Sequence, residues 1–145
     1  MSELVHRIDE GWGTFRAAVT ARRGGLDQRT PAGWRYRDLI AHVLGSEGET
    51  ARRLAIFRID GVQLEPFFAA DELSAESVAR YSRLSVGGLL DELDRTHQAL
   101  LGEVRGLSEA QLRQNRSWAE AVVARATFRH YAEHAGEWSS AGSAG

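Results

Sequence analysis

Histidine is the residue type whose spacing in this sequence most strongly suggests chemistry. Five histidines occur, and His130 and His134 are four residues apart in a segment with helical periodicity. Residues at this spacing lie one turn apart on one face of a helix, so their imidazole rings can share a metal ion. Solvated or buried imidazoles without a metal are also common at this spacing. The pair therefore indicates a metal site without establishing one.

A third histidine strengthens this interpretation. His42 lies about eight residues after the expected start of its own helix, which is ~12 Å at the helical rise per residue. The pair lies at a matching distance from the opposite end of the last helix. If the two helices are antiparallel neighbours, the three rings meet at one level and form the three-nitrogen site with an open position that catalytic zinc favours. We expect the site to bind one divalent metal ion. Zinc is the first choice, followed by nickel or iron.

The other histidines and two glutamates are weaker candidates. His97 lies on the apolar stripe of its helix and is expected to be a hydrogen-bonded core residue, with a role as fourth ligand as the alternative. His6 lies off the apolar face of its helix and is expected to be solvated. Glu49, seven residues after His42, shares its helical face and is a candidate general base or hydrogen-bonding partner, against the alternative of an exposed carboxylate. Glu47 lies on an apolar stripe and needs a partner, for which an arginine is the candidate.

The segment from His130 to His134 also matches the H-x-x-E-H pattern of inverted zinc peptidases. Those enzymes are far larger, and their third ligand is a carboxylate rather than a distant histidine. Glu133 would also lie about 100° around the helix from His134. The peptidase interpretation is therefore disfavoured.

The composition limits the classes of function. A net charge of −2 offers no basic field for a phosphate backbone, so we expect no nucleic-acid partner. The chain has no cysteine, so any catalytic thiol must arrive with a ligand. No segment approaches about 18 apolar residues and no signal sequence is visible, so we expect no membrane association and a cytoplasmic location. All 18 basic residues are arginine, which suggests a GC-rich bacterial genome.

Helical periodicity dominates the chain, and no segment alternates as a strand. We expect helices from Leu4 to the Gly24-Gly25 pair, from about Trp34 to Ile59, near Glu72 to Arg83 after a crossover loop at 62–70, and from Val86 to Val104. Capping-box spacing at Ser108 and Gln111 predicts a short turn, and the same spacing at Ser117 and Glu120 predicts a last helix from Trp118 to about Trp138. The sequence predicts one all-α domain over 1–145, a four-helix bundle with a crossover and a flexible tail at 139–145.

Two stretches together resemble a known family. Trp34-Arg35-Tyr36-Arg37-Asp38-Leu39-Ile40-Ala41-His42 and Phe128-Arg129-His130-Tyr131-Ala132-Glu133-His134 are similar to the DinB-like (DinB/YfiT) superfamily. Its pattern is a tryptophan, an Arg-Asp pair and a histidine opening the second helix, then a histidine pair four apart on the last helix. The resemblance covers nearly the whole chain and implies that His42, His130 and His134 bind metal in an up-down-down-up bundle that is often dimeric. One departure is Arg35, where the family commonly has Ser or Thr, which are natural N-caps.

The resemblance implies a range of functions. Family members include metal-dependent transferases and isomerases that use a low-molecular-weight thiol such as mycothiol or bacillithiol, self-resistance hydrolases, and proteins with no assigned activity. A three-histidine metal ion could support thiol transfer or hydrolysis. We expect a metal-dependent enzyme with a small-molecule substrate, first of all a thiol S-transferase. The alternatives are a hydrolase and a non-catalytic metal-binding or self-protection protein.

Overall fold

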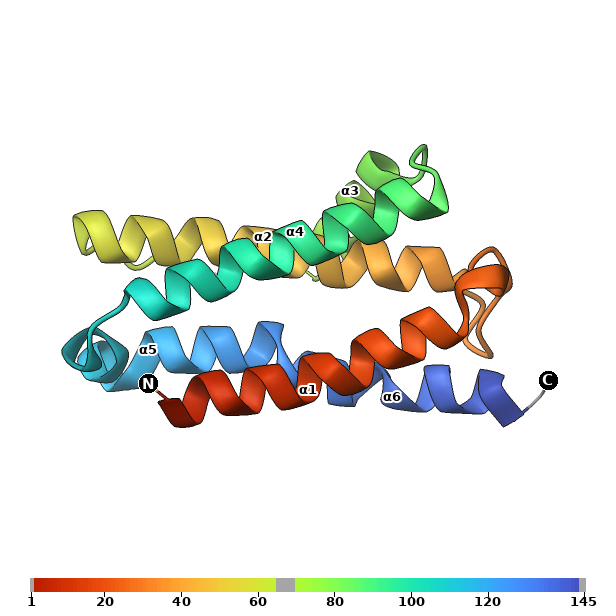
Figure 1. The fold of residues 1–145 in the computed structure, drawn as a ribbon. Helices are drawn as coiled ribbons and strands as arrows, with labels where there is room; N and C mark the ends of the chain where they lie inside the picture. Colours follow the sequence, from red (N-terminus) through yellow and green to blue (C-terminus); the bar gives the residue numbers. More distant parts are fainter. Residues whose placement is uncertain (1, 65–69, 144–145) are drawn as a thin grey trace.

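The structure is a computed structural model that describes residues 2–64 and 70–143. Its helices are α1 (Ser2–Ala21), α2 (Tyr36–Asp60), α3 (Ala70–Tyr81), α4 (Val86–Gly106), α5 (Glu109–Ala126) and α6 (Phe128–Ser143), with a 3₁₀ turn at Arg23–Gly25 (Figure 1). Over the described ranges there is no β-strand, and an isolated bridge joins Arg29 and Arg35 in the loop before α2. The predicted all-α fold is confirmed. None of the described helices has the length and apolar character needed to cross a bilayer.

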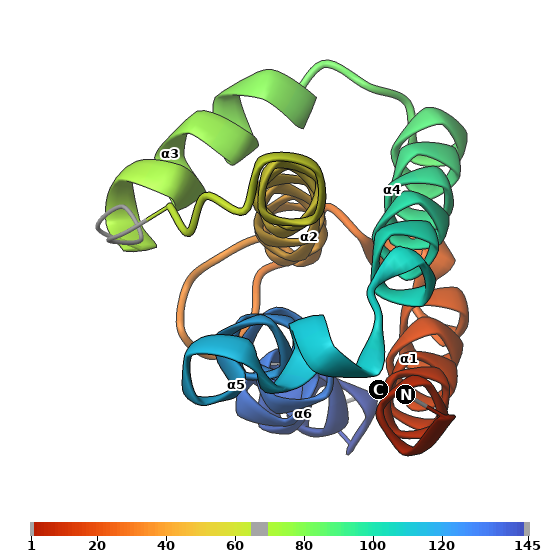
Figure 2. The same ribbon diagram turned by 90° about the vertical axis from the view of Figure 1, so that its left-hand side faces the viewer.

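The helices form an up-down-down-up bundle. In Figure 1, α1 and the α5–α6 pair run in one direction, whereas α2 and α4 run in the other. Because α2 and α4 are parallel, the chain must return along the bundle between them, and α3 makes part of that crossover on the outer side of α2 (Figure 2). Gly45 permits close packing of α3, since a Cβ atom there would overlap the hydroxyl of Ser77. Residues 65–69 of the predicted crossover loop lie outside the described residues.

The core consists of two apolar clusters at opposite ends of the bundle. One joins Leu4 and Ile8 of α1 to the C-terminal halves of α2 and α4 and to α5. The other joins Phe15 and Val19 to the N-terminal halves of α2 and α4 and to α6. Between these clusters the bundle buries polar side chains, including Glu47 and His97, each only 1% exposed. Burial of such groups is costly unless they are hydrogen bonded to one another.

The last helix differs from the prediction. A continuous helix from Trp118 to Trp138 was expected. The backbone is non-helical at 114–117, which agrees with the predicted start at Trp118, but it leaves helical geometry again at Thr127, where φ is −114° and ψ is −109°. Ser117 has φ 60° and ψ 40°, so it is not an extended N-cap and the predicted capping box with Glu120 is wrong. The other predicted capping box, Ser108 with Gln111, forms at the start of α5.

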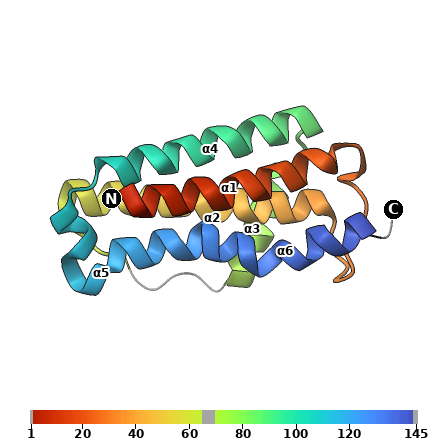
Figure 3. The same cartoon turned by 60° about the horizontal axis from the view of Figure 1, so that its bottom comes forward.

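As a result, α5 and α6 are two helices that follow one another along the same side of the bundle (Figure 3). Helix α6 begins at Phe128 and continues to Ser143. Residues 139–143 of the expected tail are therefore helical, and residues 144–145 lie outside the described residues.

Candidate metal centre

Three histidines from two helices meet where α2 and α6 face each other. His42 lies in the second turn of α2, and His130 and His134 lie in the first two turns of α6. Each offers one ring nitrogen, and these three atoms lie within 4.8 Å of one another. The Nε2 atoms of His42 and His130 are 2.9 Å apart, which is a hydrogen-bond distance. The structure therefore brings together the three ligands predicted from the sequence.

The residues that precede His42 fix the start of its helix. Arg35 occupies the N-cap with extended backbone, and its backbone N–H donates to the Asp38 carboxylate at 3.2 Å. The Arg35 guanidinium donates to the same carboxylate at 3.1 Å. Arg37 donates to two carbonyl oxygens of the loop between α3 and α4. Asp38 thus supplies the carboxylate side of a capping box although position 35 lacks Ser or Thr, and the Arg-Asp pair anchors the helix that presents His42.

The break at Thr127 fixes the start of the helix that presents the other two histidines. Thr127 is fully buried, and both its backbone N–H and its hydroxyl donate to the carbonyl oxygen of Val123, at 3.0 Å and 2.7 Å. The carbonyl of Thr127 in turn accepts the backbone N–H of Tyr131 at 2.9 Å. His130 therefore lies in the first turn of the helix that begins after this break.

The surroundings of His42 and His130 favour the neutral forms of these two rings. Burial, followed by repulsion from His42 and His134, lowers the pKa of His130 to about 3. Burial and the proximity of His134 also lower the pKa of His42, although nearby glutamates act in the opposite direction. Neutral imidazole is the form that binds metal, so these rings need not lose a proton at neutral pH.

Glu137 orients the third ring. The Nδ1 atom of His134 lies 2.9 Å from Oε2 of Glu137, three residues further along α6. A neutral His134 that donates from Nδ1 to this carboxylate keeps the lone pair of Nε2 for a metal ion. Sequence analysis did not single out Glu137, although its position three residues after His134 is a signal that could have found it.

The donor set fits a divalent transition-metal ion. Three neutral imidazoles are the ligand set of many zinc sites and also suit nickel and iron. His130 is buried, whereas His42 and His134 are half-buried, so one side of the group is accessible. Over residues 2–64 and 70–143, no carboxylate or fourth histidine joins the three. Such a site leaves coordination positions for water or substrate.

The two remaining histidines behave as predicted. His97 is buried in the core, with its Nδ1 atom 2.6 Å from Oε1 of Glu47. The side chain of His6 is 73% exposed and lies beside Glu10. The expectation that an arginine would partner Glu47 is wrong, because its second carboxylate oxygen accepts the hydroxyl of Tyr131 at 2.7 Å. Burial raises the pKa of Glu47, and the hydrogen bonds from His97 and Tyr131 oppose this rise.

Glu49 lies in a pocket between α2 and α3. Arg52 holds its carboxylate through two hydrogen bonds, and Arg53 adds a third at 3.0 Å. Burial raises the pKa of Glu49, but the hydrogen bonds from the two arginines outweigh it, so the pKa lies below its usual value. This makes Glu49 a weak proton acceptor, and its role as a general base stays a prediction. The pocket has a volume of about 280 Å³ and is lined by Gly45, Gly48, Glu49, Arg52, Glu76, Ser77, Arg80 and Tyr81.

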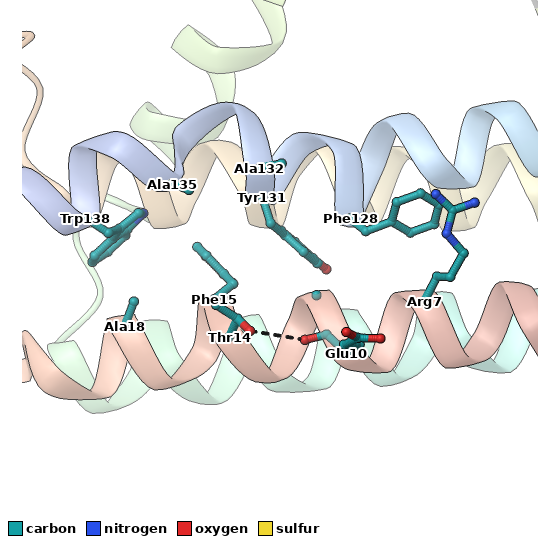
Figure 4. Close-up of a pocket in the computed structure, with 11 residues that line it drawn as sticks. Arg7, Glu10, Thr14, Phe15, Ala18, Phe128, Tyr131, Ala132, Ala135 and Trp138 are labelled. Atoms are coloured by element: carbon teal, nitrogen blue, oxygen red, sulfur yellow. Dashed lines mark hydrogen bonds between the residues drawn. The ribbon is translucent and has the colours of Figure 1, made fainter.

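A second, larger groove of about 440 Å³ runs between α1 and α6. Figure 4 shows Tyr131 and Trp138 extending from α6 into it and Phe15 extending from α1. None of the three clustered histidines lines this groove. Its volume therefore gives no information about access to the metal centre.

Comparison with known proteins agrees with this architecture. The family model described as the DinB superfamily matches residues 3–137. A crystal structure of an uncharacterised protein from Escherichia coli UTI89 is similar with a TM-score of 0.80 and 17% sequence identity, over 96% of this chain and 90% of that chain. No curated protein matches the chain. The E. coli structure supports the fold alone, whereas the family model covers the helices that carry all three histidines, and the chain belongs to the DinB superfamily.

Proposed function

We propose that this protein binds one divalent metal ion through His42, His130 and His134 and uses it in catalysis on a small molecule. The observation that carries the proposal is the convergence of three ring nitrogens within 4.8 Å from two helices. The lowered pKa values of His42 and His130 support it, because neutral rings are ready to bind metal. Zinc is the first choice, before nickel or iron. A bound ion would lower the pKa of a water or thiol and polarise an electrophile.

Within this class we propose that the reaction is the transfer of an electrophilic group to a low-molecular-weight thiol, such as mycothiol or bacillithiol. The chain has no cysteine, so the nucleophilic sulfur of such a reaction must belong to a co-substrate. His42 and His134 are half-buried rather than fully buried, which is consistent with approach of a co-substrate. Hydrolysis uses the same metal chemistry with water as nucleophile and is the alternative that the assay must separate.

The pocket between α2 and α3 is our proposed location for part of the substrate. Gly45 and Glu49 line it, and they follow His42 on α2 by three and seven residues, which places them along the same face of the helix. The far wall carries Ser77 and Arg80 of α3. A pocket with hydroxyl, guanidinium and carboxylate groups suits a polar, charged molecule better than a hydrocarbon.

The test is a comparison of zinc-loaded wild-type protein with a triple variant, His42→Ala, His130→Ala, His134→Ala. Each is incubated with an electrophile and with mycothiol or bacillithiol, and products are identified by mass spectrometry. We expect a thiol conjugate with the wild-type protein and only the background rate with the variant. If the electrophile is hydrolysed and no thiol conjugate forms, the reaction is hydrolysis rather than thiol transfer. Metal binding with no turnover of any kind would contradict the enzymatic part of the proposal.

A further inference from the structure

The buried polar cluster at the centre of the bundle consists of Glu47, His97 and Tyr131. Oε1 of Glu47 lies 2.6 Å from Nδ1 of His97, and Oε2 accepts the hydroxyl of Tyr131 at 2.7 Å. The ring of Trp12 stacks on His97 with centroids 3.7 Å apart and an interplanar angle of 6°. One carboxylate thus links α2 to α4 and α6, and through His97 to α1.

A buried polar cluster is weak evidence for stability, because desolvation of its groups offsets much of their attraction. Apolar side chains of similar volume would fill the same space with no such cost. The metal-centre chemistry proposed above also makes no direct use of Glu47, since the clustered ligands are His42, His130 and His134. The cluster therefore contributes mainly through the relative positions of the helices that it links.

That geometry concerns α6. The break at Thr127 separates α6 from α5, so the rotation of α6 about its own axis is not set by a continuous backbone helix. His130 and Tyr131 both lie in the first turn after the break. Contacts with other helices must then determine where the first turn points.

Two polar cross-links join this turn to α2. One is the contact between His130 and His42, and the other is the hydrogen bond from Tyr131 to Glu47. On α6 these residues are neighbours, whereas on α2 they are five positions apart, or ~7.5 Å along the axis. A hydrogen bond at this second point resists both rotation and sliding of α6 relative to α2.

We propose that Tyr131 and Glu47 are positioning residues for the metal centre, with His97 holding Glu47 in place. The proposal rests on the proposed metal-binding function, because it concerns the geometry of that site. The buried cluster ties the first turn of α6 to the rest of the bundle. His130 therefore meets His42 at the observed spacing before any metal arrives.

The test compares Tyr131→Phe with two other variants by zinc titration of the metal-free full-length protein, at a temperature where all are folded. Tyr131→Phe keeps the ring and removes the hydroxyl, and we expect zinc affinity to fall by about tenfold or more, as for loss of partners that orient metal ligands. Glu47→Gln keeps an oxygen that can accept the tyrosine hydroxyl and should retain most of the affinity. The control is Val122→Ala, which creates a cavity in the apolar cluster that contains Leu4 and Ile8. This variant should bind zinc as the wild-type protein does.

A second readout does not depend on metal. Nitrogen NMR of the histidine rings in the metal-free protein should show altered His42 and His130 signals in Tyr131→Phe and unaltered signals in Val122→Ala. Equal zinc affinity of Tyr131→Phe and wild type with unchanged ring signals would overturn the proposal, as would an equal loss in Val122→Ala. If the wild-type protein bound no zinc, the proposed function would fail, and the ring signals alone would still decide whether Tyr131 positions His130.

Discussion

Two polar clusters join α2 to α6, and they differ in how their polar atoms are used. In the buried cluster both oxygens of Glu47 have partners, and the carboxylate and His97 are each only 1% exposed. In the metal centre, three imidazoles converge with no carboxylate among them, and two of the rings are half-buried. The first arrangement is closed and the second is open to a ligand. Helices α2 and α6 contribute residues to both clusters. The closed cluster can therefore fix the relative position of these two helices, on which the spacing of the three histidines depends.

The largest expected effect is the loss of metal on removal of a clustered histidine. His42→Ala, His130→Ala and His134→Ala should each abolish measurable zinc binding, because two ring nitrogens alone form a weak site. The melting temperature in the presence of zinc should then fall to that of the metal-free protein, since bound metal stabilises the folded state by mass action. Titration calorimetry and thermal melts measure both effects. His6→Ala is the matched control and should bind zinc normally, because His6 lies exposed beside Glu10.

In the closed cluster, replacement of His97 should affect stability more than metal binding. His97→Ala leaves one oxygen of the buried Glu47 carboxylate without its partner, and we expect a loss of about 3 kcal/mol in the free energy of unfolding. Zinc affinity should change by much less than in the variants of the metal centre. Urea unfolding of the metal-free protein and zinc titration test this contrast. Abolition of zinc binding in His97→Ala, with normal binding in His42→Ala, would move the site to α4.

The metal centre should make the stability of the metal-free protein depend on pH. The pKa of His130 in the folded protein is lowered to about 3 from an ordinary 6.5, so the unfolded chain binds the proton more tightly. The free energy of unfolding of the metal-free protein should therefore fall as pH decreases from about 6.5 towards 3, by up to about 1.4 kcal/mol per pH unit. His130→Asn removes this titration and should flatten the slope. An equally steep slope in that variant would show that other groups cause the acid sensitivity.

The smallest effect should come from the carboxylate that orients His134. Glu137→Gln replaces a charged acceptor by a neutral one at the Nδ1 atom of that ring, and zinc affinity should fall by about tenfold without a change in stoichiometry. Glu92→Gln, on the exposed pair of Glu92 with Arg95, is the control. Unchanged affinity in Glu137→Gln would mean that packing alone orients His134.

The contents of the open cluster were predictable from the sequence because they depend on helical periodicity. The spacing of His130 and His134 guarantees a shared face, and the up-down-down-up order makes α2 and α6 antiparallel, which brings His42 to them. The long segment between α2 and α4 also favoured a crossover connection. These features need only the period of a helix and the order of the elements.

The closed cluster and the helix break were not predictable in the same way. The partners of Glu47 are 50 and 84 residues away in the sequence, so no local pattern reveals them. The Thr127 hydroxyl bonds to a carbonyl four residues earlier, as threonine does inside intact helices, so its type gives no sign of the break. Ser117 and Glu120 have capping-box spacing, yet the backbone at Ser117 is left-handed. In each case the local residue pattern does not indicate the observed geometry.

The most direct test of the central claim is zinc titration of the metal-free wild-type protein beside the triple variant His42→Ala, His130→Ala, His134→Ala. The convergence of three imidazole rings predicts one zinc ion per wild-type chain and none for the variant, with far-UV circular dichroism showing that both remain helical. Wild-type protein that binds zinc no better than the folded triple variant would contradict the account.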